Sequence, residues 1–172
     1  LLGKFIYQKP KMWNVYQLET FHLNKRLRGI SEICFVLRAK VHIKGFWFKR
    51  YNRAWQILVA GECDKIYGDS FERAGEEIHQ IGNNVTIRFE QMDFGEKGTK
   101  SLVICGSTPL EKNTIILKFA KDGVEEQRMV EFMGTKTKQS FEIEPIYGVN
   151  DVSLVFLPGS NFNFTSICFC EA

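Results

Sequence analysis

The stretch VTIRFEQMDFGEKG, residues 85–98, decides the fold class of this chain. Its first half alternates strictly, with Val85, Ile87 and Phe89 apolar and the residues between them polar. A period of two is typical of a β-strand that buries one face and exposes the other. The GEKG tetrapeptide that closes the stretch predicts a turn. We therefore expect a half-buried strand that runs directly into a turn.

Comparable segments follow one another along the chain, about every ten residues, and turn signals such as Lys121-Asp122-Gly123 separate them. Residues 61–82 are predicted to be a loop, and no long helix is expected. This pattern of short strands predicts an all-β fold, a β-sandwich of the jelly-roll type. The predicted strands cover residues 33–43, 46–48, 55–60, 85–90, 101–105, 114–119, 127–132, 140–144, 152–157 and 162–169.

The composition fits one compact domain, with 172 residues, 44% of them hydrophobic and 25% charged. No apolar run approaches the roughly 20 residues of a membrane helix, and no signal peptide is recognisable. The chain opens at Leu1 without a methionine, so we expect it to be a fragment of a longer protein. We expect residues 1–31 to form an irregular basic arm or linker that packs on the sandwich, and residues 32–172 to form the sandwich itself.

Charge is distributed unevenly along the sequence. Residues 1–60 carry a net charge of +10 and residues 61–172 a net charge of −7. The basic segment could pack on an acidic surface of its own chain or of a parent protein, or it could bind nucleic acid. The zinc-finger pattern and the aromatic RNP pattern are both missing, which makes nucleic acid an unlikely partner.

The chain contains five cysteines, an odd number, and their spacing is not that of a disulfide framework. We expect buried or half-buried thiols in a reducing, cytoplasmic compartment. A zinc site would require histidines to converge on them, and the spacing gives no sign of that. The residues concerned are Cys34, Cys63, Cys105, Cys168 and Cys170, with His22, His42 and His79.

Residues 60–169 resemble the family 6 carbohydrate-binding modules in three stretches: IGNNVTIRFEQMDFGEKG (81–98), NTIILKF (113–119) and YGVNDVSLVFLPGSNFNFTSICF (147–169). The YGDSF stretch at 67–71 is similar to a variant at the C-terminus of bacterial family 2 glycoside hydrolases, the β-galactosidase and β-glucuronidase group. The resemblance implies a galactose-binding-like jelly roll that binds glycan and has no catalytic activity.

The resemblance also implies where sugar would bind. In that family two aromatic rings sandwich a pyranose while an asparagine, here Asn163, hydrogen-bonds its hydroxyl groups. The first ring would lie near His79, and the second between residues 134 and 141, where this chain has no aromatic residue. Asn161 and Tyr67 are further candidates for glycan contact, although an asparagine can instead cap a turn and a tyrosine can instead cover the edge of a core.

A structural calcium ion is the other feature that the resemblance implies. Calcium takes six to eight oxygen ligands, several of them carboxylates. The matching positions are Val59, Gly61 and Thr165, none of which is acidic, so we expect no cofactor. Glu62 and Asp64 lie close by, and a shift of register would bring one of them into the ligand set.

Motifs of hydrolases, nucleotide-binding proteins and zinc proteases are missing from the sequence. The acidic pairs Glu76-Glu77 and Glu125-Glu126 are typical of solvated surface rather than of a glycosidase site. We therefore expect a non-catalytic accessory module of a glycoside hydrolase such as a β-galactosidase. It would bind carbohydrate or pack on its parent catalytic domain. The alternative is a structural or oligomerisation domain that has lost sugar binding.

Overall fold

The computed structural model describes residues 2–24, 27, 30, 32–48 and 52–171. The chain divides into two compact units, Leu1–Arg50 and Tyr51–Ala172, which are described separately below. The division falls after Arg50, whereas the sequence predicted a boundary after residue 31.

The described residues of the first unit contain neither helix nor strand. The strands expected at residues 33–43 and 46–48 are therefore wrong. A strand needs a partner and a surface on which to bury its apolar face, but Phe35, Leu37 and Val41 remain exposed. Local aromatic contacts form instead, and the rings of Phe35 and Phe46 lie 4.9 Å apart.

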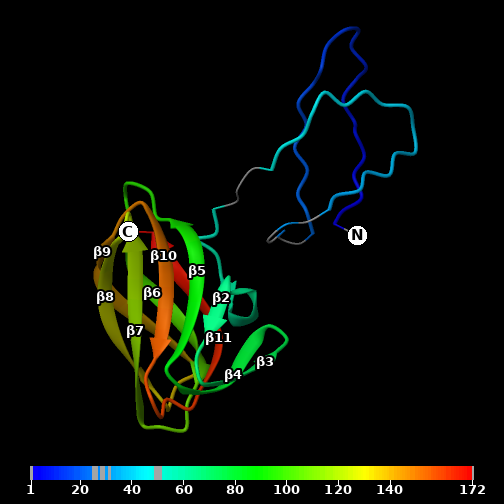
Figure 1. Ribbon diagram of the computed structural model, residues 1–172. Coiled ribbons are helices and arrows are strands. Elements are labelled where there is room, and N and C mark those ends of the chain that lie inside the picture. Colours follow the sequence, from blue (N-terminus) through cyan, green and yellow to red (C-terminus); the bar gives the residue numbers. More distant parts are fainter. Residues whose placement is uncertain (1, 25–26, 28–29, 31, 49–51, 172) are drawn as a thin grey trace. The chain divides into compact units, whose positions relative to one another are not determined.

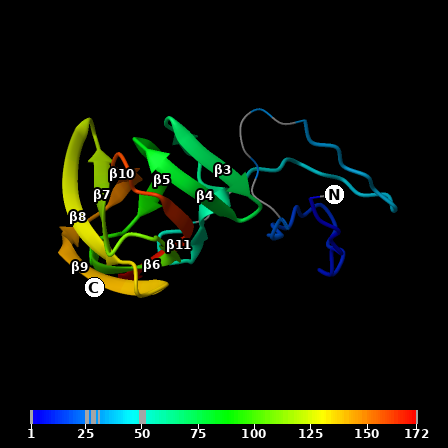
Figure 2. The same cartoon turned by 90° about the horizontal axis from the view of Figure 1, so that it is seen from below.

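The second unit is a sandwich of two antiparallel sheets, which Figure 2 shows as separate layers. The first sheet contains, in spatial order, β3 (Ser70–Ala74), β4 (Glu77–Asn83), β11 (Phe162–Glu171), β6 (Thr99–Ser107) and β9 (Lys138–Ile146), with β1 (Leu58–Val59) also paired to β11. The second contains β2 (Lys65–Tyr67), β5 (Val85–Asp93), β10 (Val149–Phe156), β7 (Lys112–Lys121) and β8 (Val124–Met133). A short 3₁₀ helix, η1 (Ala60–Glu62), follows β1.

The core between the sheets confirms the alternation seen in the sequence. Val85, Ile87 and Phe89 are completely buried on β5. At one end of the core, Phe94 packs edge-on against Trp55, Phe119 and Phe169, with ring centroids 5.0–6.4 Å apart. Edge-to-face packing is the favoured geometry for aromatic pairs and adds specificity to the burial of apolar area.

The prediction of a loop over residues 61–82 is wrong, because β2, β3 and β4 lie there. The buried residues of β4, Ile78 and Ile81, are three apart rather than two. Gln80 has a positive φ of 51°, and the pairing of β4 with β11 shifts register next to it. This β-bulge inserts one extra residue and so hides the strand from a search for period two.

Strand direction gives the sandwich two different ends. The loops at residues 68–69, 108–111, 134–137 and 157–161 gather at one end, which we call the loop end. The tight connections at residues 94–98, 122–123 and 147–148 gather at the other, the turn end. In Figure 1 the arrow of β7 points to the turn end and that of β10 to the loop end.

The cysteines are less buried than predicted. All five are free, but Cys34 and Cys170 are exposed, and only Cys63 is fully buried. The described part of the chain contains no group of three or more His, Cys, Asp or Glu residues arranged to hold a metal ion. Within the same residues, no helix is long and apolar enough to cross a membrane.

Candidate functional site

The bulge in β4 brings His79 and Asn163 together. Phe162 pairs with Ile81 and Phe164 with Ile78, so Asn163 lies opposite the extra residue of the bulge. The backbone N–H of Gln80 donates to Asn163 Oδ1 over 2.9 Å. The Asn163 acceptor therefore stabilises the bulge, and its amide nitrogen is the group left for a ligand.

His79 is also engaged within the sheet. Its Nε2 lies 2.7 Å from Glu77 Oε2, and Thr165 Oγ1 donates to Glu77 Oε1 over 3.3 Å. The hydrogen bond with His79, assisted by the weaker one from Thr165 and opposed by slight burial, lowers the pKa of Glu77. These three side chains form a compact polar cluster on the outer surface of β4 and β11.

The positions that the resemblance assigns to calcium do not fit that ion. Val59 pairs with Ser166 in the sheet, and the N–H of Gly61 donates to the carbonyl of Glu76 over 2.7 Å. Thr165 supplies a hydroxyl group that is already bonded to Glu77. The three positions offer no carboxylate of their own, whereas calcium sites rely on several charged oxygens.

Asn161 lies exposed in the 157–161 loop at the loop end, where its φ of 48° is positive. Asparagine tolerates this left-handed conformation better than most residues. A hydrogen bond of 2.8 Å from Gly159 N to the carbonyl of Gly82 connects the loop to the end of β4. Asn161 thus provides the left-handed residue of this loop, and its side chain is exposed at the loop end.

Tyr67 lies on the other sheet, so the structure does not gather the four predicted glycan contacts on a single sheet. It ends β2 opposite Thr86, on the outer face of the five-stranded sheet, and its side chain is 56% exposed. Lys65 and Arg88 lie one step along the same face, where they pair with each other in register. Tyr67 is therefore an exposed ring at the margin of a charged surface.

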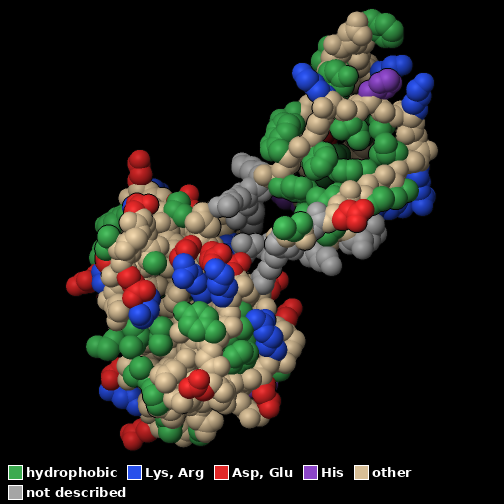
Figure 3. Space-filling view, viewed as in Figure 1, with side chains coloured by type: hydrophobic (Ala, Val, Ile, Leu, Met, Phe, Trp, Pro, Cys, Tyr) green, Lys and Arg blue, Asp and Glu red, His purple; other side chains and the backbone are tan. Residues whose placement is uncertain are grey.

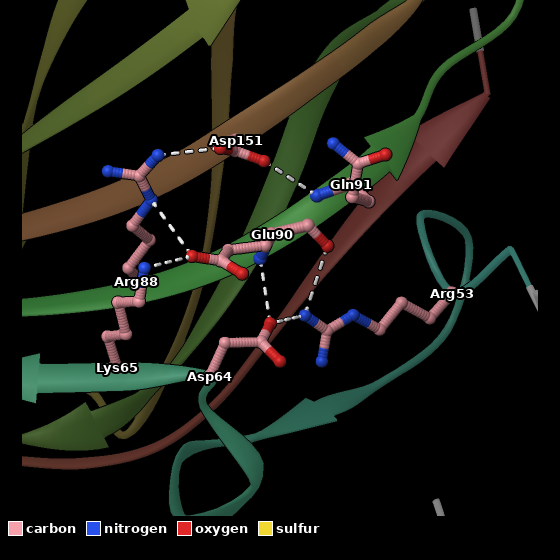
Figure 4. A network of polar contacts seen from close by, with 7 residues as sticks. All are labelled: Arg53, Asp64, Lys65, Arg88, Glu90, Gln91 and Asp151. Carbon is pink, nitrogen blue, oxygen red and sulfur yellow. Dashed lines mark hydrogen bonds and ion pairs between the residues drawn. The ribbon is translucent and has the colours of Figure 1, made fainter. Parts of the chain in front are cut away.

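The charged surface beside Tyr67 is a balanced network, shown in Figure 4. Lys65 Nζ lies 2.7 Å from Glu90 Oε1, and Arg88 Nη2 lies 2.6 Å from Asp151 Oδ2. The hydrogen bond to Asp151 raises the pKa of Arg88 further, so its guanidinium stays protonated. In Figure 3 the basic side chains of the sandwich lie directly beside acidic ones over β10 and β5.

Asp64 and Asp151 connect this network to an irregular point in β5. Asp64 accepts a 2.7 Å hydrogen bond from Glu90 N and forms an ion pair with Arg53. Asp151 Oδ1 accepts a 2.8 Å hydrogen bond from Gln91 N. Partial burial would raise the pKa of Asp151, but the Gln91 N–H and the Arg88 guanidinium together lower it. Asp64 thus holds the backbone of Glu90, and Asp151 holds that of Gln91, whose φ is positive.

The second ring of the predicted clamp is missing from the structure as well as from the sequence. The 134–137 loop is closed by Gln139, whose side chain accepts from Met133 N at 2.9 Å and donates to Met133 O at 2.8 Å. Among the described residues of the sandwich, Tyr67 and Tyr147 are the only aromatic side chains classed as exposed. The sequence analysis did not single out Tyr147 as a site residue.

Two antiparallel sheets connected in this way define a jelly-roll β-sandwich, as the sequence predicted. The chain is similar to solved structures of that fold. A family 6 carbohydrate-binding module from Clostridium stercorarium in complex with cellobiose is 22% identical with a TM-score of 0.56, over 69% of this chain and 95% of that one.

Two further structures show the same likeness. A family 6 module from Clostridium cellulolyticum in complex with xylose is 20% identical (TM-score 0.56, 69% and 98% covered). A β-1,3-glucan-binding family 6 module from Bacillus halodurans is 19% identical (TM-score 0.52, 69% and 97% covered). No family model matches the sequence, and no curated protein is significantly similar to it. At these identities the likeness establishes the fold.

Proposed function

We propose that the sandwich is a non-catalytic carbohydrate-binding module and that Tyr67 is the ring on which a sugar stacks. The observation that carries the proposal is the half-exposed Tyr67 on a regular sheet, next to fixed hydrogen-bonding groups. The C–H face of a pyranose packs on an aromatic face, and a few placed polar groups then fix its orientation. The similar solved structures include complexes with cellobiose and with xylose, which supports this class of ligand.

The charge balance beside Tyr67 favours a neutral glycan. Lys65 and Arg88 are paired with Glu90 and Asp151, so no unpaired charge remains in this network for an acidic sugar. Paired side chains are also held in position before a ligand arrives, which lowers the entropy cost of binding. His79 and Asn163 lie on the other sheet, and Asn161 lies in the 157–161 loop. We therefore propose these three as contacts with a different part of a long glycan, with the Asn163 amide nitrogen as a donor to hydroxyl groups.

In its parent protein, the module would hold glycan close to a catalytic domain or pack on that domain. Tethering raises the local concentration of substrate without any new chemistry. We propose a bacterial, cytoplasmic glycoside hydrolase of family 2, such as a β-galactosidase, as the parent, because of the YGDSF and IGNNV stretches. We propose no cofactor, since the three positions matched to calcium ligands lack carboxylates.

The alternative proposal is a structural or oligomerisation domain that has lost sugar binding. One observation favours it. The polar groups around the bulge bond to one another instead of facing a ligand unpaired. The Gln80 backbone N–H donates to Asn163 Oδ1, and His79 Nε2 lies 2.7 Å from Glu77 Oε2.

Affinity electrophoresis of the full chain in gels that contain xylan, mixed-linkage β-glucan or laminarin tests the proposal. We expect one of the polysaccharides to retard the protein and Tyr67→Ala to weaken this binding at least 10-fold. Met129→Ala is the matched control, because Met129 is also exposed on the five-stranded sheet but far from Tyr67 in strand order. Migration unaffected by every polysaccharide would overturn the proposal in favour of the structural domain.

A further inference from the structure

We infer that the turn end carries a second, separate saccharide subsite built around Tyr147. This inference rests on the proposed glycan-binding function and adds a site that the sequence resemblance does not indicate. A groove of about 330 Å³ lies between the β7–β8 and β9–β10 connections. Its lining includes Lys121, Asp122, Val124, Glu126, Tyr147 and Asn150.

The Tyr147 ring is held firmly but remains accessible. Its side chain is 51% exposed, and it packs directly on the backbone of Gly98. A Cβ atom at position 98 would lie only 2.6 Å from Tyr147 Cδ1 and 2.7 Å from Cε1. The glycine therefore makes room for the ring, and the half of the side chain that Gly98 does not cover faces solvent.

The backbone that carries Tyr147 is fixed by hydrogen bonds from two directions. Asn150 Nδ2 donates to the carbonyls of Tyr147 at 3.0 Å and Gly148 at 3.2 Å. Phe94 N donates to the carbonyl of Gly148 at 2.8 Å, and Gly148 N to that of Gly95 at 2.9 Å. A ring on so constrained a turn loses little conformational entropy when a ligand stacks on it.

Asn150 also provides an unused acceptor. Its side chain is only 5% exposed, and its amide nitrogen donates to two carbonyls, which fixes which way the amide points. Within the described residues, nothing donates a hydrogen bond to Asn150 Oδ1. Because Asn150 Oδ1 is not one of the fully buried side-chain atoms that lack a partner, it is accessible, and a hydroxyl group of a ligand in the groove would donate to it.

The rim of the groove combines one base with acids. Lys121 and Asp122 form no ion pair with any described residue, whereas Glu126 is paired with Arg128. One accessible ring, the Asn150 acceptor, and the opposite charges of Lys121 and Asp122, which cancel, fit a neutral sugar. A volume of about 330 Å³ lies at the lower end of the range for ligand pockets, which suits one sugar ring or the end of a chain.

Strand direction separates the two proposed subsites. Tyr67 lies toward the loop end of the five-stranded sheet, and Tyr147 lies at the turn end. The two rings therefore cannot sandwich one sugar, and each acts alone. Two weak sites on one module would bind a long polysaccharide more tightly than a short oligosaccharide, through effective concentration.

NMR titration of the ¹⁵N-labelled full chain with cellotriose and, separately, xylotriose tests the inference. We expect two independent groups of amide shifts, one around Thr86 and Arg88 and one around Asp122 and Gly148. Tyr147→Leu keeps an apolar side chain over Gly98 and should weaken binding at the second group at least 10-fold. Tyr67→Ala should remove only the first group, and Val149→Ala, an exposed neighbour on β10, serves as the matched control.

The outcomes separate the two proposals. Shifts confined to the surroundings of Tyr67 would overturn the second subsite and leave the glycan-binding function standing. Shifts confined to the turn end would support the second subsite and remove Tyr67 from the proposed function. With no shifts for either sugar, and no retardation by the polysaccharides, both proposals fail.

Discussion

At the scale of single residues, two aspartates hold irregular backbone to the sandwich. The Asp64 carboxylate binds Glu90 N and the Arg53 guanidinium, and both side chains of the ion pair are about nine-tenths buried. The Arg53 guanidinium also lies 5.5 Å from the centre of the Phe89 ring. A buried ion pair adds little net stability compared with apolar residues, but removing only one of its two charged side chains strongly destabilises the fold.

Asp64→Ala should therefore lower the free energy of unfolding by about 3–5 kcal/mol, because the Arg53 guanidinium would stay buried after losing this carboxylate. Urea denaturation at pH 7 measures the change. Glu96→Ala is the control, because Glu96 is exposed in the 94–98 turn, and it should alter stability by less than about 0.5 kcal/mol. A loss of the same small size for Asp64→Ala would contradict the structural role assigned to the pair.

Asp151 predicts a pH dependence of stability. Its folded pKa lies below the ordinary value of 3.8, so its contribution is complete above about pH 5 and is lost as the pH falls through the folded pKa. Asp151→Asn should be less stable than the parent chain at pH 7, and the difference should shrink between pH 4 and pH 2. Thermal unfolding across that range measures it. A difference that stays constant with pH would show that Asp151 is not preferentially ionised in the folded state.

At the scale of elements, the β4 bulge combines a local irregularity with a candidate binding residue. Gln80 can take its positive φ because Asn163 Oδ1 accepts its N–H. Asn163→Ala should cost about 1 kcal/mol, the usual net contribution of one hydrogen bond. Asn163→Asp keeps the acceptor but loses the amide donors, so it should retain stability and weaken glycan binding. Equal stability of the alanine and aspartate variants would show that the bulge does not depend on this bond.

The same element shows what sequence alone could predict. Regular strands such as β5, β7 and β10 follow from period two, because each buries alternate residues on a single core. In β4 the bulge breaks the period, and in residues 33–43 the period exists without a strand, since pairing depends on partners that periodicity does not reveal. Strand formation is a property of the sheet as much as of the segment.

The candidate site was predictable to a similar extent. Tyr67 lies at the end of β2 instead of in the predicted loop, and its contact with glycan stays a prediction. The absence of a second ring could be read directly from residues 135–140. Tyr147, the residue of the inferred second subsite, was not predicted, because its exposure depends on Gly98 and Asn150, which only the fold brings beside it. The hydrogen bond that Asn163 Oδ1 accepts from the Gln80 N–H could not be predicted either, because it depends on the bulge in β4.

At the scale of the whole molecule, the sandwich is held by its aromatic core and charge network, and we propose that no bound metal contributes. The calcium-matched positions hold backbone pairing and a hydroxyl group in place of carboxylates. Calcium would raise the melting temperature only if the folded chain bound it. Excess EDTA should therefore leave the melting temperature of the full chain unchanged. Scanning calorimetry with EDTA and with added calcium checks this. A melting temperature that falls with EDTA and recovers with calcium would contradict the proposal.

The most direct test of the central claim is a crystal structure of the full chain soaked with cellotriose or xylotriose. Our account predicts a pyranose stacked on the ring of Tyr67, with hydroxyl groups within hydrogen-bond distance of the Lys65, Arg88 and Glu90 network. A sugar bound only on surfaces away from Tyr67 would contradict it. So would a hydrolysed trisaccharide, which would reveal catalysis by the sandwich itself.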